Sequence, residues 1–305
     1  MTRTRHLLLG ALLLMMTTSL PPRGASAAEP AARQPGTHDR VMSSNIWGDY
    51  FGNPPHERDE ALAGVLLRYA PDLIALQEVT PNWWRSRLFT ALAADYAVAD
   101  GGASDQRRTN YTPLLYRRSR FELLLQGVDF FHLKLDRSKG VTWAVLRDLA
   151  SGRLVIAFST HFWWKGTDES NYIRTVNAER LAERLLGLQR QHGGAPVLGG
   201  GDFNCQVASD ALRLLQAKGL ASAQEVADEA SPVCSHHGDP KRDATGHYRG
   251  VPRPADNVKA RSIDHLLVSA ASVRVLREMV ILDQDALDAS DHSPILMDVA
   301  LTTER

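Results

Sequence analysis

Acids, amides and imidazoles recur in this sequence at the points where predicted strands end. Short apolar runs such as 73–76 and 156–160 are typical of buried strands, and each is followed closely by a polar residue of this kind. Strand ends in α/β proteins meet at one edge of a sheet, where ligands usually bind. Four carboxylates, two amides and two imidazoles gathered there would suit a hard cation and a phosphate group. The eight residues are Asn45, Glu78, His161, Asp202, Asn204, Asp264, Asp291 and His292.

These residues lie in six short segments whose order along the chain is informative. The segments are Asn45, Leu76-Gln77-Glu78, Ser159-Thr160-His161, Gly201-Asp202-Phe203-Asn204, Ser262-Ile263-Asp264-His265 and Ser290-Asp291-His292-Ser293-Pro294. Together they resemble the ordered motifs of the endonuclease/exonuclease/phosphatase superfamily, which has the DNase I-like fold. The resemblance spans residues 41–301 and implies a four-layer α/β sandwich, with two mixed β-sheets packed face to face and helices outside. It also implies metal-dependent hydrolysis of phosphate esters.

The resemblance guides which residues would hold the metal. Mg²⁺ prefers oxygen ligands in an octahedron and keeps several waters. Glu78 is the first ligand candidate, and Asn45 and Asp291 would complete or support the site directly or through water. Mg²⁺ is the expected ion, with Mn²⁺ or Ca²⁺ as alternatives.

The remaining residues would act on the phosphate and on water. In the family, Asp202 corresponds to the base that holds and activates the attacking water. Asn204 can donate its amide N–H to a phosphate oxygen, and His161 and His292 can donate to the non-bridging oxygens in the transition state. Asp264 would hold His292, because a carboxylate on one ring nitrogen fixes the tautomer and favours the protonated imidazole. A Tyr or Arg often assists in this family; Tyr111 and Arg174 are the candidates.

The elements that must position these residues alternate between helices and strands. Leu62, Val65, Leu66 and Tyr69 recur at helical spacing and predict a helix over 56–69; further helices are predicted over 174–189 and 210–217. Strands are predicted at 73–76, 112–116, 121–125, 143–146, 154–160, 197–198, 263–269, 273–282 and 294–301. Residues 230–260 are rich in Pro, His, Asp and Gly and predict a long loop. No linker interrupts this pattern, which favours one catalytic α/β domain over 40–305.

The first residues have the pattern of an export signal. Arg3, Arg5 and His6 precede an apolar run over 7–16, which is too short to span a bilayer, and a polar stretch ends in small residues at Ala25-Ser26-Ala27. We expect a signal peptide over 1–27, cleaved near Ala27, and a flexible leader over 28–39. The protein would then be secreted or periplasmic, without stable insertion in a membrane.

Charge and composition limit the partners. The chain has 305 residues, 44% of them hydrophobic and 23% charged, which is typical of a globular protein. Removing residues 1–27 takes away three arginines and no acid, leaving 32 basic and 35 acidic residues and a net charge of −3. This balance does not favour nucleic acid as the substrate, although it leaves a local basic patch open. We expect a monomer acting on a phosphoester of undetermined class: nucleic acid, nucleotide, sugar or inositol phosphate, or phospholipid. The alternative is a secreted binding protein that kept the fold and lost catalysis.

Cysteine, histidine and glycine raise three further questions. Cys205 and Cys234 are the only cysteines, and in an exported chain a bridge between them is favoured over two buried thiols. Zinc is suggested by His236-His237, His247 and Cys234 but disfavoured by their irregular spacing. The glycines at 199–201 would let the chain turn sharply and present Asp202, or form an ordinary turn after a short strand.

Overall fold

The computed structural model describes residues 38–100, 110–132, 134, 136–231, 233–252 and 262–302. The predicted signal peptide, and the leader up to residue 37, lie outside the described residues. The prediction that the leader extends to residue 39 is wrong at its end, because Asp39 is buried in the first strand and Arg40 pairs with Asp298 at 2.7 Å. No helix among the described residues is long and apolar enough to cross a membrane.

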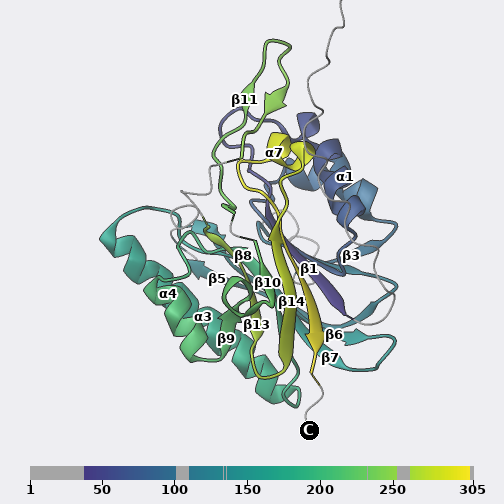
Figure 1. Cartoon of the computed structure of the whole chain (residues 1–305), viewed down its shortest axis with the longest axis vertical. Coiled ribbons are helices and arrows are strands. Elements are labelled where there is room, and N and C mark those ends of the chain that lie inside the picture. Colours follow the sequence, from purple (N-terminus) through teal and green to yellow (C-terminus); the bar gives the residue numbers. More distant parts are fainter. Residues whose placement is uncertain are drawn as a thin grey trace, which may run out of the picture. The chain divides into compact units, whose positions relative to one another are not determined.

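Two mixed β-sheets form the centre of the domain (Figure 1). The first sheet has the order β10 (Glu229–Ala230), β14 (Val273–Val280), β15 (Ile295–Leu301), β1 (Asp39–Asn45), β2 (Leu73–Gln77), β4 (Leu114–Arg117) and β3 (Tyr96–Ala99). The second has the order β5 (Phe121–His132), β6 (Asp136–Asp148), β7 (Leu154–His161), β8 (Val197–Asp202), β13 (Asp264–Ser269) and β9 (Leu220–Ser222). In Figure 1 the purple strand β1 lies beside the yellow C-terminal strands, because β1 pairs antiparallel with β15.

Helices cover the outer face of each sheet. The helices are α1 (Asp59–Tyr69), α2 (Arg87–Leu92), α3 (Asp168–Gln191), α4 (Asp210–Ala217), α5 (Ala223–Val226) and α7 (Gln284–Ala289). Apolar side chains of α1, α2 and α7 pack on the first sheet, and those of α3 and α4 pack on the second. A third apolar cluster, with members such as Val41 and Leu266, fills the space between the sheets. These layers confirm the predicted four-layer sandwich.

The predicted elements are confirmed in kind, and the differences lie mainly at their ends. The helix predicted over 174–189 begins earlier, at Asp168, because the Thr167 side chain accepts a hydrogen bond from the Ser170 backbone N–H and caps it. Strands β5 and β6 are much longer than predicted, because they pair with each other over most of their length as one long hairpin. The predicted loop over 230–260 contains a short hairpin, β11 (Lys241–Arg242) and β12 (Tyr248–Arg249), and its residues 232 and 253–260 lie outside the described residues.

The three glycines 199–201 lie inside strand β8, so the predicted turn is wrong. A Cβ on Gly201 would come within 2.0 Å of the Thr160 carbonyl oxygen, and one on Gly200 within 3.1 Å of Ser43 in the facing sheet. Side chains are therefore excluded by close packing on both faces of β8. This packing brings β8 near β1, whose last residue is Asn45.

The predicted disulfide is also wrong. Cys205 and Cys234 are both buried thiols that are not bonded to each other. Cys205 belongs to the apolar cluster beneath α3 and α4, where the Ser209 side chain hydrogen-bonds its thiol. Burial raises the pKa of the Cys205 thiol to about 11, which makes it a poor nucleophile.

Glu278 provides a test of stability that is independent of the site. Burial between the sheets raises the pKa of this acid from 4.5 to about 7. The folded protein therefore binds this proton more tightly than the unfolded chain, and its free energy of unfolding falls as the pH rises from about 4.5 to about 7. Since Glu278→Gln has no proton to lose, we expect it to exceed the parent in stability by about 2–3 kcal/mol at pH 8 and to match it near pH 4.5.

Urea unfolding at the two pH values measures this difference. The control is Glu229→Gln, which alters an exposed acid on the neighbouring strand β10 and should change stability little at either pH. A Glu278→Gln variant with the same stability difference at both pH values would contradict the prediction.

Candidate active site

Strand register places three predicted residues in one row across the second sheet. His161 at the end of β7 lies opposite Asp202 of β8, and Asp202 lies opposite Asp264 of β13. All three side chains are buried, and His161 Nε2 lies 3.4 Å from Asp202 Oδ2. The row is therefore fixed by backbone pairing rather than by mobile loops.

Asn45 connects the first sheet to this row. Its Nδ2 donates to Glu78 Oε1 at 3.2 Å and to Asp202 Oδ2 at 3.0 Å, so one amide joins carboxylates carried by different sheets. Its Oδ1 accepts from the Trp47 backbone N–H at 3.0 Å. The amide oxygen is thus turned to the backbone, and this geometry favours support of a metal site over direct ligation. The second oxygen of Glu78 accepts from the Gly48 backbone N–H at 2.7 Å.

His292 and Asp264 form a buried dyad. His292 Nδ1 lies 2.8 Å from Asp264 Oδ2, and Ser235 Oγ donates to the same oxygen at 2.7 Å. Burial lowers the pKa of His292, but the nearby carboxylates of Asp264 and Asp291 outweigh it and hold that pKa well above its usual value. Since Asp264 accepts the proton on Nδ1, His292 Nε2 is the nitrogen left to face Asp202, at 4.0 Å from its Oδ2.

Opposing interactions act on the pKa of the Asp202 carboxylate. Burial and the charge of Asp264 raise its pKa to about 7, against the lowering effect of His292 and Lys139. The Asn204 backbone N–H donates to Asp202 Oδ1 at 2.8 Å, which fixes the carboxylate plane. The Asn204 side chain donates to the Phe162 carbonyl at 3.3 Å, so in this structure its amide N–H is used within the protein. A buried carboxylate that titrates near neutrality is suited to accepting a proton from water.

Lys139 is a site residue that no sequence pattern indicates. Its Nζ, on β6, lies 2.8 Å from His161 Nε2 and is fully enclosed. Burial lowers the Lys139 pKa, while Glu78 and Asp202 raise it. Burial and the Lys139 charge together hold the pKa of His161 well below its usual value, so His161 is a neutral imidazole here.

Asp291 completes the acidic side of the site. Burial raises its pKa to about 6, His292 lowers it, and the charge of Glu78 raises it further. Two carboxylates that repel each other in a buried space fit a cation bound between them. The donor set of Glu78 and Asp291, with the Asn45 amide behind them, therefore suits a hard divalent ion.

Three residues around the site adopt a backbone conformation that favours glycine. Trp47, Glu78 and Asn204 have φ values of 54°, 62° and 51°. Such left-handed conformations are uncommon for side chains other than Asn and Asp, and they cluster at functional sites where the surrounding structure enforces them. Glu78 and Trp47 are therefore held in place at a conformational cost.

Arg58 holds two segments of the site together from behind. Its guanidinium is buried, makes no ion pair with a carboxylate among the described residues, and lies over the Trp47 and Trp83 rings, with its carbon 4.6 Å and 5.0 Å from the ring centroids. It donates to the backbone carbonyl oxygens of Ile46, Trp47, Asn53 and Ala289. The first three flank Gly48, which binds Glu78, and the last directly precedes Ser290 and Asp291.

We expect Arg58→Lys to lower stability by about 3 kcal/mol, because one ammonium cannot replace the planar fork and leaves buried carbonyls without donors. Activity should fall as well, since both segments carry site residues. Denaturant unfolding and kcat/KM measure the two effects. The matched control is Arg68→Lys in α1, whose guanidinium also reaches the α7 region but through exposed ion pairs with Asp283 and Asp285. If both variants behave alike, Arg58 does not have this role.

Arg174 and Tyr111 are the two candidates for an assisting residue, and the segment after β7 also carries an exposed tryptophan. Arg174 donates to the backbone carbonyls of Trp163 and Lys165, so it holds the chain that follows β7. Trp164 is exposed, and Lys165 Nζ lies 5.9 Å from its ring centroid. Tyr111 is half-buried, and burial and nearby acids raise its pKa.

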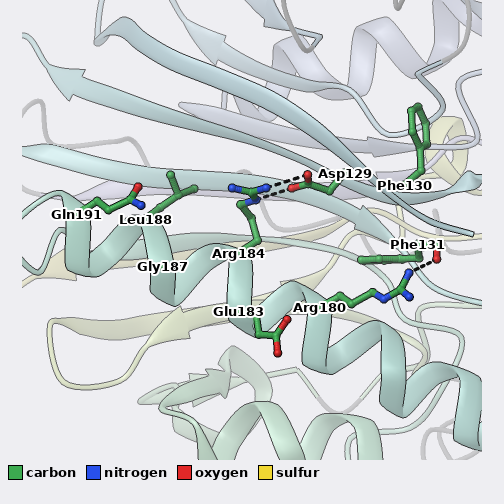
Figure 2. A pocket seen from close by; sticks show the side chains of 9 residues that line it. All are labelled: Asp129, Phe130, Phe131, Arg180, Glu183, Arg184, Gly187, Leu188 and Gln191. Atoms are coloured by element: carbon green, nitrogen blue, oxygen red, sulfur yellow. Dashed lines mark hydrogen bonds and ion pairs between the residues drawn. The ribbon is translucent and has the colours of Figure 1, made fainter. Parts of the chain in front are cut away.

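A separate cavity of about 410 Å³ lies between β5 and α3 (Figure 2). Arg184 pairs with Asp129 through two contacts of 2.5 Å and 3.0 Å, and Arg180 donates to the Phe131 backbone carbonyl (Figure 2). Its arginines are thus already engaged within the protein. The cavity contains none of the eight predicted residues, and we do not assign the chemistry to it.

Comparison with known proteins agrees with this arrangement. The profile of the Endonuclease/Exonuclease/phosphatase family matches residues 42–292. The chain belongs to this family. The match includes all eight predicted site residues, from Asn45 to His292. No curated protein matches the chain significantly.

Solved structures with the family's fold are similar over most of the chain. A family member from Bacteroides vulgatus is 22% identical with a TM-score of 0.67, and the match covers 88% of this chain and 100% of that one. A mannosyl-6-phosphatase from Bacteroides thetaiotaomicron is 20% identical with a TM-score of 0.64, covering 87% and 99%. The catalytic domain of human nocturnin, with bound sulfate, is 19% identical with a TM-score of 0.64, covering 87% and 95%. At these identities the similarity establishes the shared fold.

Proposed function

We propose that this protein is a metal-dependent phosphoesterase that cleaves a P–O bond by direct attack of water. The observation that carries the proposal is the Asn45 bridge, which brings Glu78 of one sheet to Asp202 of the other beside the His292–Asp264 dyad. Family membership supports this class of reaction, and the mannosyl-6-phosphatase and the sulfate-bound nocturnin domain share the fold.

In this proposal each residue acts from the position described above. Asp202 accepts a proton from the attacking water, whose oxygen forms a bond to phosphorus as the bond to the leaving oxygen breaks. His292 donates through Nε2 to a non-bridging oxygen, while Asp264, which accepts a hydrogen bond from Ser235, holds its ring. Lys139 offsets negative charge beside His161, and His161 and Asn204 orient the phosphate. Fixed donors of this kind are most effective where charge develops in the transition state.

Glu78 and Asp291 would hold the metal, with Asn45 positioning Glu78. A bound Mg²⁺ would neutralise charge on the phosphoryl group and polarise it. Mn²⁺ and Ca²⁺ are the alternatives for the same oxygen ligands.

The decisive experiment is a substrate panel assayed with and without EDTA. The panel comprises DNA, RNA, nucleotides, sugar phosphates, inositol phosphates and sphingomyelin. We expect turnover of at least one class, its loss on chelation, and its return when Mg²⁺ is added back. Turnover unaffected by EDTA would overturn the metal dependence. Binding of Mg²⁺ and of a panel member without any turnover would instead support the alternative, a binding protein with this fold.

We further propose that the chain is exported and cleaved near Ala27. The basic residues and apolar run at the start of the sequence support this. Mass spectrometry of the protein recovered outside the cytoplasm should give the mass of a chain whose first residue is at about position 28. A full-length cytoplasmic chain would contradict export.

A further inference from the structure

The loop that carries His236 is paired with the segment that carries Asp291 and His292. His236 forms a β-bridge with His292, the Ser293 backbone N–H donates to the Ser235 carbonyl at 2.7 Å, and the His237 backbone N–H donates to the Asp291 carbonyl at 3.0 Å. These bonds fix the backbone of His236 against the site, although it lies 55 residues before Asp291 in the sequence.

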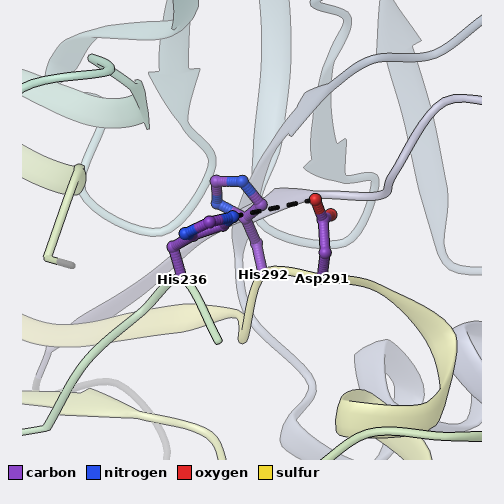
Figure 3. Close-up of side chains that lie close together, drawn as sticks. All are labelled: His236, Asp291 and His292. Carbon is purple, nitrogen blue, oxygen red and sulfur yellow. Dashed lines mark ion pairs between the residues drawn. The ribbon is translucent and has the colours of Figure 1, made fainter. Parts of the chain in front are cut away.

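Three side chains converge as a result (Figure 3). His236 Nε2 lies 3.9 Å from Asp291 Oδ2, and the His236 and His292 rings are 4.6 Å apart between centroids. One ligand atom from each residue lies within 4.8 Å of the others. His236 is 22% exposed and Asp291 15% exposed at the side chain, so an ion can reach the cluster from solvent.

The donor set differs from that of the proposed Mg²⁺ site. Two imidazole nitrogens and one carboxylate oxygen suit Zn²⁺, which binds such ligands tetrahedrally at about 2.0–2.2 Å. Mg²⁺ prefers oxygen ligands and gains little from imidazole. Three protein ligands would leave one position for water or another exogenous ligand.

We propose that His236, Asp291 and His292 form an inhibitory Zn²⁺ site. His292 Nδ1 is engaged by Asp264 at 2.8 Å, so His292 would bind the ion through Nε2. This is the nitrogen assigned above to the phosphate, and Asp291 is assigned above to Mg²⁺. Zn²⁺ bound here therefore removes one proton donor and one metal ligand at once. Binding depends on the cluster alone, whereas the inhibition rests on the proposed function.

Metal binding tests the first part without any substrate. Metal-free protein is titrated with Zn²⁺ by calorimetry, and with Co²⁺ by absorption spectroscopy as a probe of nitrogen ligation. We expect one Zn²⁺ per chain and a Co²⁺ spectrum that Zn²⁺ abolishes. His236→Gln should weaken Zn²⁺ binding by at least about 100-fold, since even outer-shell partners of metal ligands contribute about 10- to 100-fold. The control is His247→Gln, which alters a histidine of the same loop that lies outside the cluster.

Enzyme assays in Mg²⁺ test the second part. Stoichiometric Zn²⁺ should inhibit the parent and His247→Gln, and His236→Gln should need at least about 100 times more Zn²⁺ for the same inhibition. Equal Zn²⁺ affinity of the parent and a folded His236→Gln variant would overturn the site. Tight binding at the site without inhibition of an active enzyme would overturn its inhibitory role. If no substrate is turned over, the proposed function fails, while the calorimetry still decides the site.

Discussion

Asp202→Asn is expected to lower kcat by about 10²- to 10⁴-fold, with little change in KM. The amide is isosteric, but it cannot accept a proton from the attacking water. Its stability should not fall, because burial and Asp264 already raise the Asp202 pKa to about 7, and a neutral side chain avoids that cost. Steady-state kinetics and thermal unfolding of the same preparation measure both quantities.

The control for this variant is Asp210→Asn, which removes an exposed acid eight residues later at the start of α4. It should retain activity. An Asp202→Asn variant that is folded and as active as the parent would remove Asp202 from the reaction.

Glu78→Gln is expected to have the second large effect, through the metal. The amide has the same shape and keeps one oxygen, but it loses the charge that attracts a divalent cation. We expect Mg²⁺ affinity to fall by more than about 10-fold and activity at low Mg²⁺ to fall by about 10³-fold, with partial recovery as Mg²⁺ is raised. Calorimetry with Mg²⁺ and activity across a Mg²⁺ series measure these changes.

Glu60→Gln in α1 is the matched control, because Glu60 is an exposed acid whose ion pair with Arg87 lies on the surface. A loss of activity in Glu78→Gln that is independent of Mg²⁺ concentration would assign Glu78 a role other than metal binding.

The residues that the sequence could predict are those that follow strands. A strand ends where its apolar run ends, so the polar residue beyond it is placed by the sheet. His161 and Asp202 are the last residues of β7 and β8, whereas Asp264 is the first residue of β13, and the strand register places the three side by side. The alternation of helices and strands predicted one α/β domain, and the family resemblance implied the four-layer sandwich.

The residues that the sequence could not predict are placed by long-range packing. Lys139 lies near the start of β6, and only the pairing of β6 with β7 reveals that its ammonium group reaches His161. The irregular spacing of His236 from the other zinc candidates of its loop disfavoured a zinc site in the sequence. Its actual neighbours, Asp291 and His292, lie far along the chain, so no local spacing could show them.

The orientation of the Asn45 side-chain amide likewise could not be predicted from the sequence. An asparagine can offer an oxygen or an N–H, and its residue type does not say which faces the metal. The Trp47 backbone N–H decides this by occupying Oδ1. The disulfide prediction was wrong for a related reason, since the presence of two cysteines in a sequence does not indicate which way each side chain packs.

The left-handed backbone at Glu78 has a consequence for the engineering of this protein. Glycine would adopt a φ of 62° without strain, so at that position the residue best for folding differs from the acid that the proposed metal site requires. A laboratory selection for heat resistance alone would therefore tend to replace this acid and yield robust but inactive descendants. Mutant libraries designed to increase thermal stability should therefore keep position 78 constant and vary other positions.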